Sequence, residues 1–157
     1  MGEGCRVTAM LAAAWKAEMV EMLTLQALAQ MAREPRLQAR LSSWVTVAKA
    51  HTTRLLTRIA ALGGGPLPVP PDEVEIAQPL AEALAAESES ARYSAERYAL
   101  IALAARKVFD PSTAWICELN RAEELERANE FSEFAQLLRG KLSAGAEGIG
   151  PNCQGRP

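Results

Sequence analysis

The one histidine of the chain, His51, is the side chain best suited to carry chemistry. It lies on an apolar stripe at helical spacing, so its imidazole points into the surface that this helix buries. The stripe consists of Leu41, Trp44, Ala48, His51, Leu55, Ile59 and Leu62. A buried imidazole either binds a metal ion or forms hydrogen bonds within the core, and the stripe alone leaves both interpretations open.

Carboxylates also lie on the inward stripes of the other predicted helices. Glu18 interrupts the apolar stripe near the N-terminus, and Glu87 lies on an equivalent stripe later in the chain. Glu124 faces inward one helical turn before Arg127, whereas the other glutamates between 118 and 130 are predicted to form a solvent-exposed face. Because an unpaired buried charge is costly, the inward carboxylates need a metal ion or a cationic partner.

Four long helices are predicted to position these side chains. Helical periodicity predicts helices over about 8–33, 35–62, 80–108 and 111–138. Pro35 and Pro111 suit the first turns of the second and fourth helices, and Gly140 is predicted to end the fourth.

The segment 63–79, GGGPLPVPPDEVEIAQP, is rich in glycine and proline and is predicted to be an extended linker. Fully extended, it spans up to about 50 Å, which exceeds the roughly 40 Å length of a 25–30-residue helix. We therefore expect a crossover along the whole bundle, with the third helix parallel to the second.

The two halves of the chain show matching register. His51 follows Pro35 by 16 residues (51 − 35), and Arg127 follows Pro111 by 16 residues (127 − 111). The sequence therefore predicts two similar helical hairpins in which His51 and Arg127 occupy equivalent places.

Composition and charge exclude several classes of protein. A formal net charge of −2 argues against a nucleic-acid or anionic-membrane surface. The sequence has no apolar run of membrane-spanning length and no signal-peptide pattern at its start, so we expect a cytoplasmic protein. Cys5, Cys117 and Cys153 are odd in number and widely spaced, which predicts reduced thiols. We expect one bundle domain over 1–140 and a glycine-rich, flexible tail over 141–157.

The hairpin repeat, the crossover and the segment His-x-x-x-Leu-Leu-x-x-Ile-x-x-Leu-Gly-Gly that begins at His51 resemble the ferritin-like superfamily over residues 10–139. The bacterioferritin and rubrerythrin branches are the most similar. The resemblance implies an all-α fold, a ferritin-like four-helix bundle. In that superfamily each hairpin supplies one glutamate from its first helix and a Glu-x-x-His pair from its second, and together these residues hold two iron ions.

Three of the six ligand positions implied by this resemblance are retained, namely Glu18, His51 and Glu124. The other three are changed: Ala48 begins the first Glu-x-x-His pair, Ala91 replaces the glutamate of the third helix, and Arg127 ends the second pair. The resemblance implies that the three retained residues face the same metal position.

The resemblance also implies neighbours for this site. Arg127 would replace the positive charge of the missing ion, and Tyr98 stands where the superfamily often has a tyrosine. Glu21 and Glu87 would be the reserve ligands of a two-metal site if the alignment shifts by one turn.

Two functions remain open. One imidazole and two carboxylates with open positions suit a single Fe(II) or Mn(II) ion, which would make the protein an oxidoreductase that activates oxygen or peroxide. Alternatively, Arg127 pairs with the carboxylates, and the protein is a metal-free binding or structural module. We expect a homodimer, with Trp44 and Trp115 marking its surface, and no nucleic-acid or membrane partner. The sequence identifies no small-molecule substrate.

Overall fold

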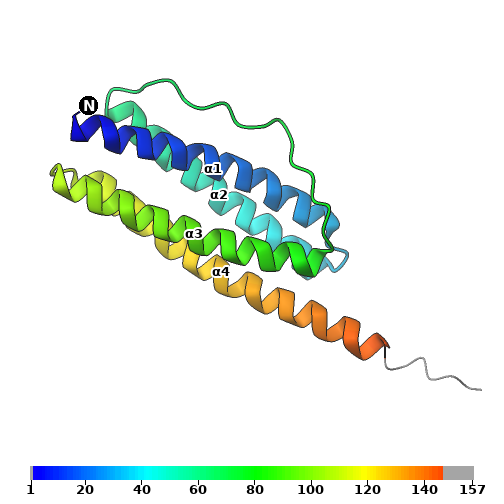
Figure 1. Cartoon of the computed structure of the whole chain (residues 1–157). Helices are drawn as coiled ribbons and strands as arrows, with labels where there is room; N and C mark the ends of the chain where they lie inside the picture. Colours follow the sequence, from blue (N-terminus) through cyan, green and yellow to red (C-terminus); the bar gives the residue numbers. More distant parts are fainter. Residues whose placement is uncertain (1, 147–157) are drawn as a thin grey trace, which may run out of the picture.

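A computed structural model describes residues 2–146, and within that range it contains four helices and no strand. Figure 1 shows them side by side as an elongated bundle. The helices are α1 (Glu3–Met31), α2 (Pro35–Ala61), α3 (Leu80–Lys107) and α4 (Pro111–Ala146). The predicted all-α four-helix bundle is confirmed.

The helices form two antiparallel hairpins joined by a long crossover. α1 packs along α2, and α3 packs along α4. The hairpins meet through α1 with α3 and through α2 with α4, so α1 lies diagonally opposite α4 and α2 opposite α3. The connection from α2 to α3 runs the length of the bundle, and α3 starts at the same end as α2 (Figure 1). The predicted crossover and the parallel direction of α2 and α3 are therefore confirmed.

Local chemistry sets the helix ends where the hairpins turn. α2 begins with a proline in its first turn and ends before three consecutive glycines, Gly63, Gly64 and Gly65, with φ angles of 102°, 72° and 151°. Such angles are accessible to glycine at little steric cost, which explains the abrupt end of α2. At the start of α4, the backbone N–H of Thr113 donates to Oδ1 of Asp110 at 3.0 Å, as expected of a cap.

The predicted end of the fourth helix is wrong. α4 continues through Gly140 to Ala146, because a glycine inside a helix costs only about 1 kcal/mol and no proline lies between Gly140 and Ala146. Its last turns extend past the ends of the other helices (Figure 1). The first part of the predicted flexible tail is therefore helical, and residues 147–157 lie outside the described range.

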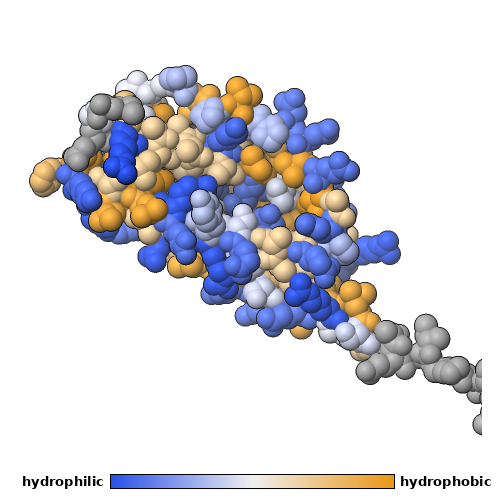
Figure 2. All heavy atoms as spheres, in the orientation of Figure 1, coloured by the Kyte–Doolittle hydropathy of each residue, from blue (hydrophilic) through white to orange (hydrophobic). Residues whose placement is uncertain are grey.

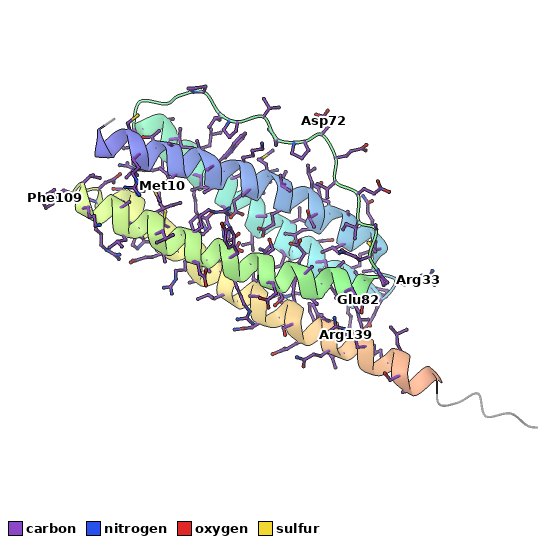
Figure 3. All side chains as sticks on the ribbon, in the orientation of Figure 1. Met10, Arg33, Asp72, Glu82, Phe109 and Arg139 are labelled. Atoms are coloured by element: carbon purple, nitrogen blue, oxygen red, sulfur yellow. The ribbon has the colours of Figure 1, made fainter. Side chains whose placement is uncertain are left out.

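Two apolar clusters fill the bundle on either side of its middle. One contains Leu11, Leu55 and Ile101, and the other contains Leu28 and Phe131. Side chains occupy the interior from the end near Met10 to the end near Glu82 (Figure 3). Glu18, His51 and Glu124 lie between the two clusters.

The two tryptophans do not share an environment. Trp44 is buried, packs edge-on against Phe131 and donates its indole N–H to Glu130, whereas Trp115 is 65% exposed. The prediction that both mark an exposed dimer surface is wrong for Trp44, because its stripe faces the core. Glu130 is likewise drawn inward from the face predicted to be exposed.

Candidate metal centre in the middle of the bundle

His51 lies between two carboxylates at the centre of the molecule. Its Nδ1 atom is 3.2 Å from Oε2 of Glu18 and 3.2 Å from Oε1 of Glu124. All three side chains are at most 2% exposed. Because α1, α2 and α4 contribute one residue each, the cluster joins both hairpins. Among the described residues, these three form the group whose ligand atoms could hold a metal ion, all within 4.8 Å of one another.

The second oxygen of each carboxylate is held by a neighbour. The hydroxyl of Tyr98 donates to Oε1 of Glu18 at 2.7 Å, and Nη2 of Arg127 donates to Oε2 of Glu124 at 2.6 Å. These contacts orient the carboxylates so that their remaining oxygens point toward His51. Tyr98 and Arg127 therefore lie beside the cluster.

The other ring nitrogen of His51 contacts Glu123, a residue predicted to face solvent. Nε2 lies 2.8 Å from Oε2 of Glu123, and the same oxygen accepts a hydrogen bond from Nη1 of Arg54 at 2.6 Å. Arg54 also donates to Oδ1 of Asn120 at 2.8 Å. The prediction that Glu123 belongs to an exposed face is therefore wrong. Arg54 lies one helical turn after His51, and a cation at this position could have indicated that a carboxylate lies near Nε2 of His51.

Arg127 stands on the opposite side of Glu124 from His51. Its guanidinium is 1% exposed and forms ion pairs with both Glu21 and Glu124, while its Nε atom has no hydrogen-bond partner. Burial lowers the pKa of Arg127 to about 10, so the group remains a cation at neutral pH. Of the carboxylates predicted to pair with Arg127 in the metal-free alternative, Glu124 does so and Glu18 does not, because the second partner is Glu21.

The remaining predicted positions do not supply further ligands. Ala48 and Ala91 are buried and carry no polar side chain. Glu21 is occupied by Arg127, and Glu87 lies outside the three-residue group. The reserve ligands are therefore not placed for a second ion.

Burial and mutual contacts shift the pKa values of the cluster. Burial opposes the charged form of His51, but its contacts with Glu124 and Glu18 outweigh this and raise its pKa to about 10. Burial also raises the pKa of Glu124 to about 7. For Glu18, burial acts upward but is outweighed by His51 and Tyr98, so its pKa is lowered. In the absence of a metal ion, the imidazole of His51 is therefore protonated and positively charged at neutral pH.

The distances fit a metal ion between His51 and the carboxylates. Two ligands at right angles, each about 2.1 Å from an ion, are about 3.0 Å apart, close to the observed 3.2 Å. A charge-assisted N–H···O bond prefers about 2.7–2.9 Å and a single acceptor, whereas Nδ1 is equidistant from two. The contact of Nε2 with Glu123 is the outer hydrogen bond that metal-binding histidines generally make.

The charges of the cluster are compatible with a divalent ion. With the imidazole deprotonated, as a bound metal would require, and every carboxylate ionised, the four carboxylates of Glu18, Glu21, Glu123 and Glu124 have two guanidiniums, Arg54 and Arg127, within ion-pair distance, which leaves a formal charge of −2. One divalent cation neutralises that charge, and so do two protons. The residues present therefore fit a single divalent ion.

No protein-family model matches the sequence, and no curated protein matches it. Solved structures do resemble it. A protein of Xanthomonas campestris pv. campestris aligns with a TM-score of 0.82 at 17% identity, covering 92% of this chain and 98% of that chain. A ferritin-like, diiron-carboxylate protein of Bacillus anthracis aligns with a TM-score of 0.78 at 18% identity, covering 86% and 99%.

The third is the bacterioferritin of Desulfovibrio desulfuricans, whose structure describes a diiron site. It aligns with a TM-score of 0.80 at 16% identity and covers 99% of this chain and 94% of that chain. These likenesses show that the chain has the ferritin-like fold. None of the described helices has the length and apolar character needed to cross a membrane.

Proposed function

We propose that this ferritin-like protein binds one divalent transition-metal ion, Fe(II) or Mn(II), through Glu18, His51 and Glu124, and acts as an oxidoreductase. The observation that carries the proposal is the position of Nδ1 of His51, equidistant from two buried carboxylate oxygens while Nε2 contacts a third carboxylate. A lone pair facing two carboxylates requires a cation or a proton between them.

Each protein group has a separate part in this proposal. Tyr98 and Arg127 fix the carboxylates of Glu18 and Glu124, and Glu123 fixes the ring of His51. Arg127 also provides a permanent positive charge where the di-iron proteins of this fold have a second ion, so this chain would hold one metal instead of two. A bound iron or manganese ion would supply one-electron redox chemistry toward oxygen or peroxide.

Arg127 also supports an alternative, a metal-free binding or structural module. Its ion pairs with Glu21 and Glu124 compensate two of the buried carboxylates without a metal. In that case a proton stays on His51, held by Glu18 and Glu124, and the polar core only stabilises the fold.

Metal titration separates the two. Metal-free wild-type protein would be titrated with Mn(II) under anaerobic conditions, with bound ion followed by electron paramagnetic resonance. We expect one Mn(II) per chain, a loss of binding in His51→Ala, and no change in Glu126→Gln, which alters an exposed carboxylate of the same helix as Glu124. An absence of saturable binding in the wild type would establish the metal-free alternative.

The redox part is tested on its own. Fe(II)-loaded protein should consume peroxide or oxygen, and Zn(II)-loaded protein should not, because zinc has no redox chemistry. Equal consumption by both forms would contradict an oxidoreductase role. The cytoplasmic location and the homodimer remain predictions, which fractionation and sedimentation would check.

A further inference from the structure

A hollow of about 370 Å³ lies between α1 and α3, and Glu18, His51 and Glu124 do not line it. α1 contributes Lys16, Val20 and Glu21 to its wall, and α3 contributes Glu87 and Arg97. Hydrophilic side chains gather over the middle of this face (Figure 2). None of these groups is a ligand of the proposed metal site, although Glu21 is paired with Arg127.

The cations at one end of the hollow lack carboxylate partners. Among residues 2–146, neither Lys16 nor Arg97 lies within ion-pair distance of an acidic group. Nε of Arg97 is buried without a hydrogen-bond partner, and Nη2 donates to Oγ of Ser94 at 3.1 Å. A half-buried guanidinium with an unused donor is a binding group for a carboxylate.

The rest of the wall is partly apolar, and its two carboxylates are Glu21, which is paired with Arg127, and Glu87. Ala17, Val20 and the ring of Tyr93 line the space beside the cations. Glu87 lies ten residues before Arg97, or about 15 Å along α3, so it is too distant to pair with that arginine. Burial raises the pKa of Glu87 to about 7, which weakens its repulsion of an anion.

We propose that this hollow binds a small organic carboxylate with an apolar tail. Its carboxylate would contact Arg97 and Lys16, and its tail would lie against Ala17, Val20 and Tyr93. The two unpaired cations favour an anion over an amine, since the one free carboxyl of the wall is at the far end. This proposal does not depend on a metal at His51.

Phenylacetate is the probe, with benzyl alcohol and benzylamine as its neutral and cationic counterparts. Binding to the metal-free full-length protein would be measured by ligand-observed NMR titration. We expect saturable binding of phenylacetate and at least tenfold weaker binding of benzyl alcohol, because charge-assisted hydrogen bonds are lost.

Variants test the position of the carboxylate. Arg97→Gln should weaken phenylacetate binding about tenfold or more, Lys16→Gln should weaken it less, and Glu87→Gln should leave it equal or tighter. The matched control is Arg92→Gln, an exposed arginine of α3 that pairs with Glu89 outside the hollow. Circular dichroism establishes that each variant is folded.

Three results would overturn the proposal. The first is an absence of saturable phenylacetate binding to the wild type. The second is wild-type affinity in Arg97→Gln. The third is preferential binding of benzylamine that is lost in Glu87→Gln, which would assign the hollow to amines.

Discussion

His51 and Arg127 occupy equivalent places in the two hairpins, yet their surroundings differ. His51 has carboxylates at both ring nitrogens, from Glu18, Glu124 and Glu123. Arg127 has Glu21 and Glu124 on its two terminal nitrogens. Glu124 belongs to both groups and joins them. Both halves of the polar core therefore concentrate negative charge around a nitrogenous side chain.

The difference lies in whether the positive charge is exchangeable. The guanidinium of Arg127 keeps its charge at neutral pH even after burial lowers its pKa to about 10. The imidazole of His51 has one titratable proton, which a metal ion displaces when it binds. One half of the core thus carries a built-in cation, and the other half accepts one from outside.

Removing the built-in cation tests this contrast most strongly. Arg127→Met should lower the free energy of unfolding by about 3–5 kcal/mol, because Glu21 and Glu124 lose their buried partner. Urea denaturation measures the loss, with Arg92→Met as the exposed control, expected to change stability by under about 1 kcal/mol. Similar losses in both variants would show that Arg127 has no special role.

Protonation of His51 should make the free energy of unfolding of the metal-free protein depend on pH. The pKa of His51 is about 10 in the folded state, above the value of about 6.5 in the unfolded chain. The folded state therefore binds more protons between these values, so the free energy of unfolding should fall with rising pH, by up to about 1.4 kcal/mol per unit.

Urea denaturation at pH 7, 8 and 9 measures this slope. The stabilisation from His51 is fully present below about pH 6.5 and is lost as the pH rises toward 10. His51→Gln should show a flatter profile over the same range. A wild-type profile as flat as that of the variant would contradict a protonated, stabilising imidazole.

Removing the charge of Glu123, which contacts Nε2 of His51, should have a smaller effect, on metal affinity. Glu123→Gln should reduce Mn(II) affinity about 10–100-fold, because the hydrogen bond to Nε2 of His51 loses its charge. Glu126→Gln, on the exposed side of α4, is the matched control. Unchanged affinity in Glu123→Gln would mean that the contact does not tune the site.

The hydroxyl of Tyr98 provides the smallest test. Tyr98→Phe should lower the free energy of unfolding by about 1.5 kcal/mol, since Oε1 of Glu18 loses its donor at 2.7 Å. Thermal or urea denaturation measures it. Tyr93→Phe is the control, because Tyr93 is 69% exposed. A stabilised Tyr98→Phe variant would show that the contact is unfavourable.

The helical periodicity of apolar residues, together with the positions of glycine and proline, was sufficient to predict the fold. Apolar stripes at helical spacing identified four helices, and the glycine and proline run at 63–79 indicated the crossover. Gly140 misled because a single glycine interrupts a helix only weakly. The stripe containing His51 is buried from Leu41 to Ile59 as predicted, whereas Leu62 is half-buried.

The contacts of the site depend on how each helix is rotated about its axis and on how deeply each side chain is buried, and the sequence pattern specifies both poorly. Glu123 and Glu124 are consecutive, so they differ by about 100° around α4, yet both reach His51 because its ring presents a nitrogen toward each. Glu21 was held in reserve as a ligand, and it instead pairs with Arg127. Helical periodicity predicts which side chains face inward, but it does not predict which of them contact one another.

The central cluster is divided between two structural units. Glu18 and His51 come from the first hairpin and Glu124 from the second, and the hairpins touch along only two of their helix pairs. A cation bound by all three residues would link the two hairpins and stabilise their association. Ion affinity would then be coupled to hairpin association, and each would strengthen the other by the same free energy.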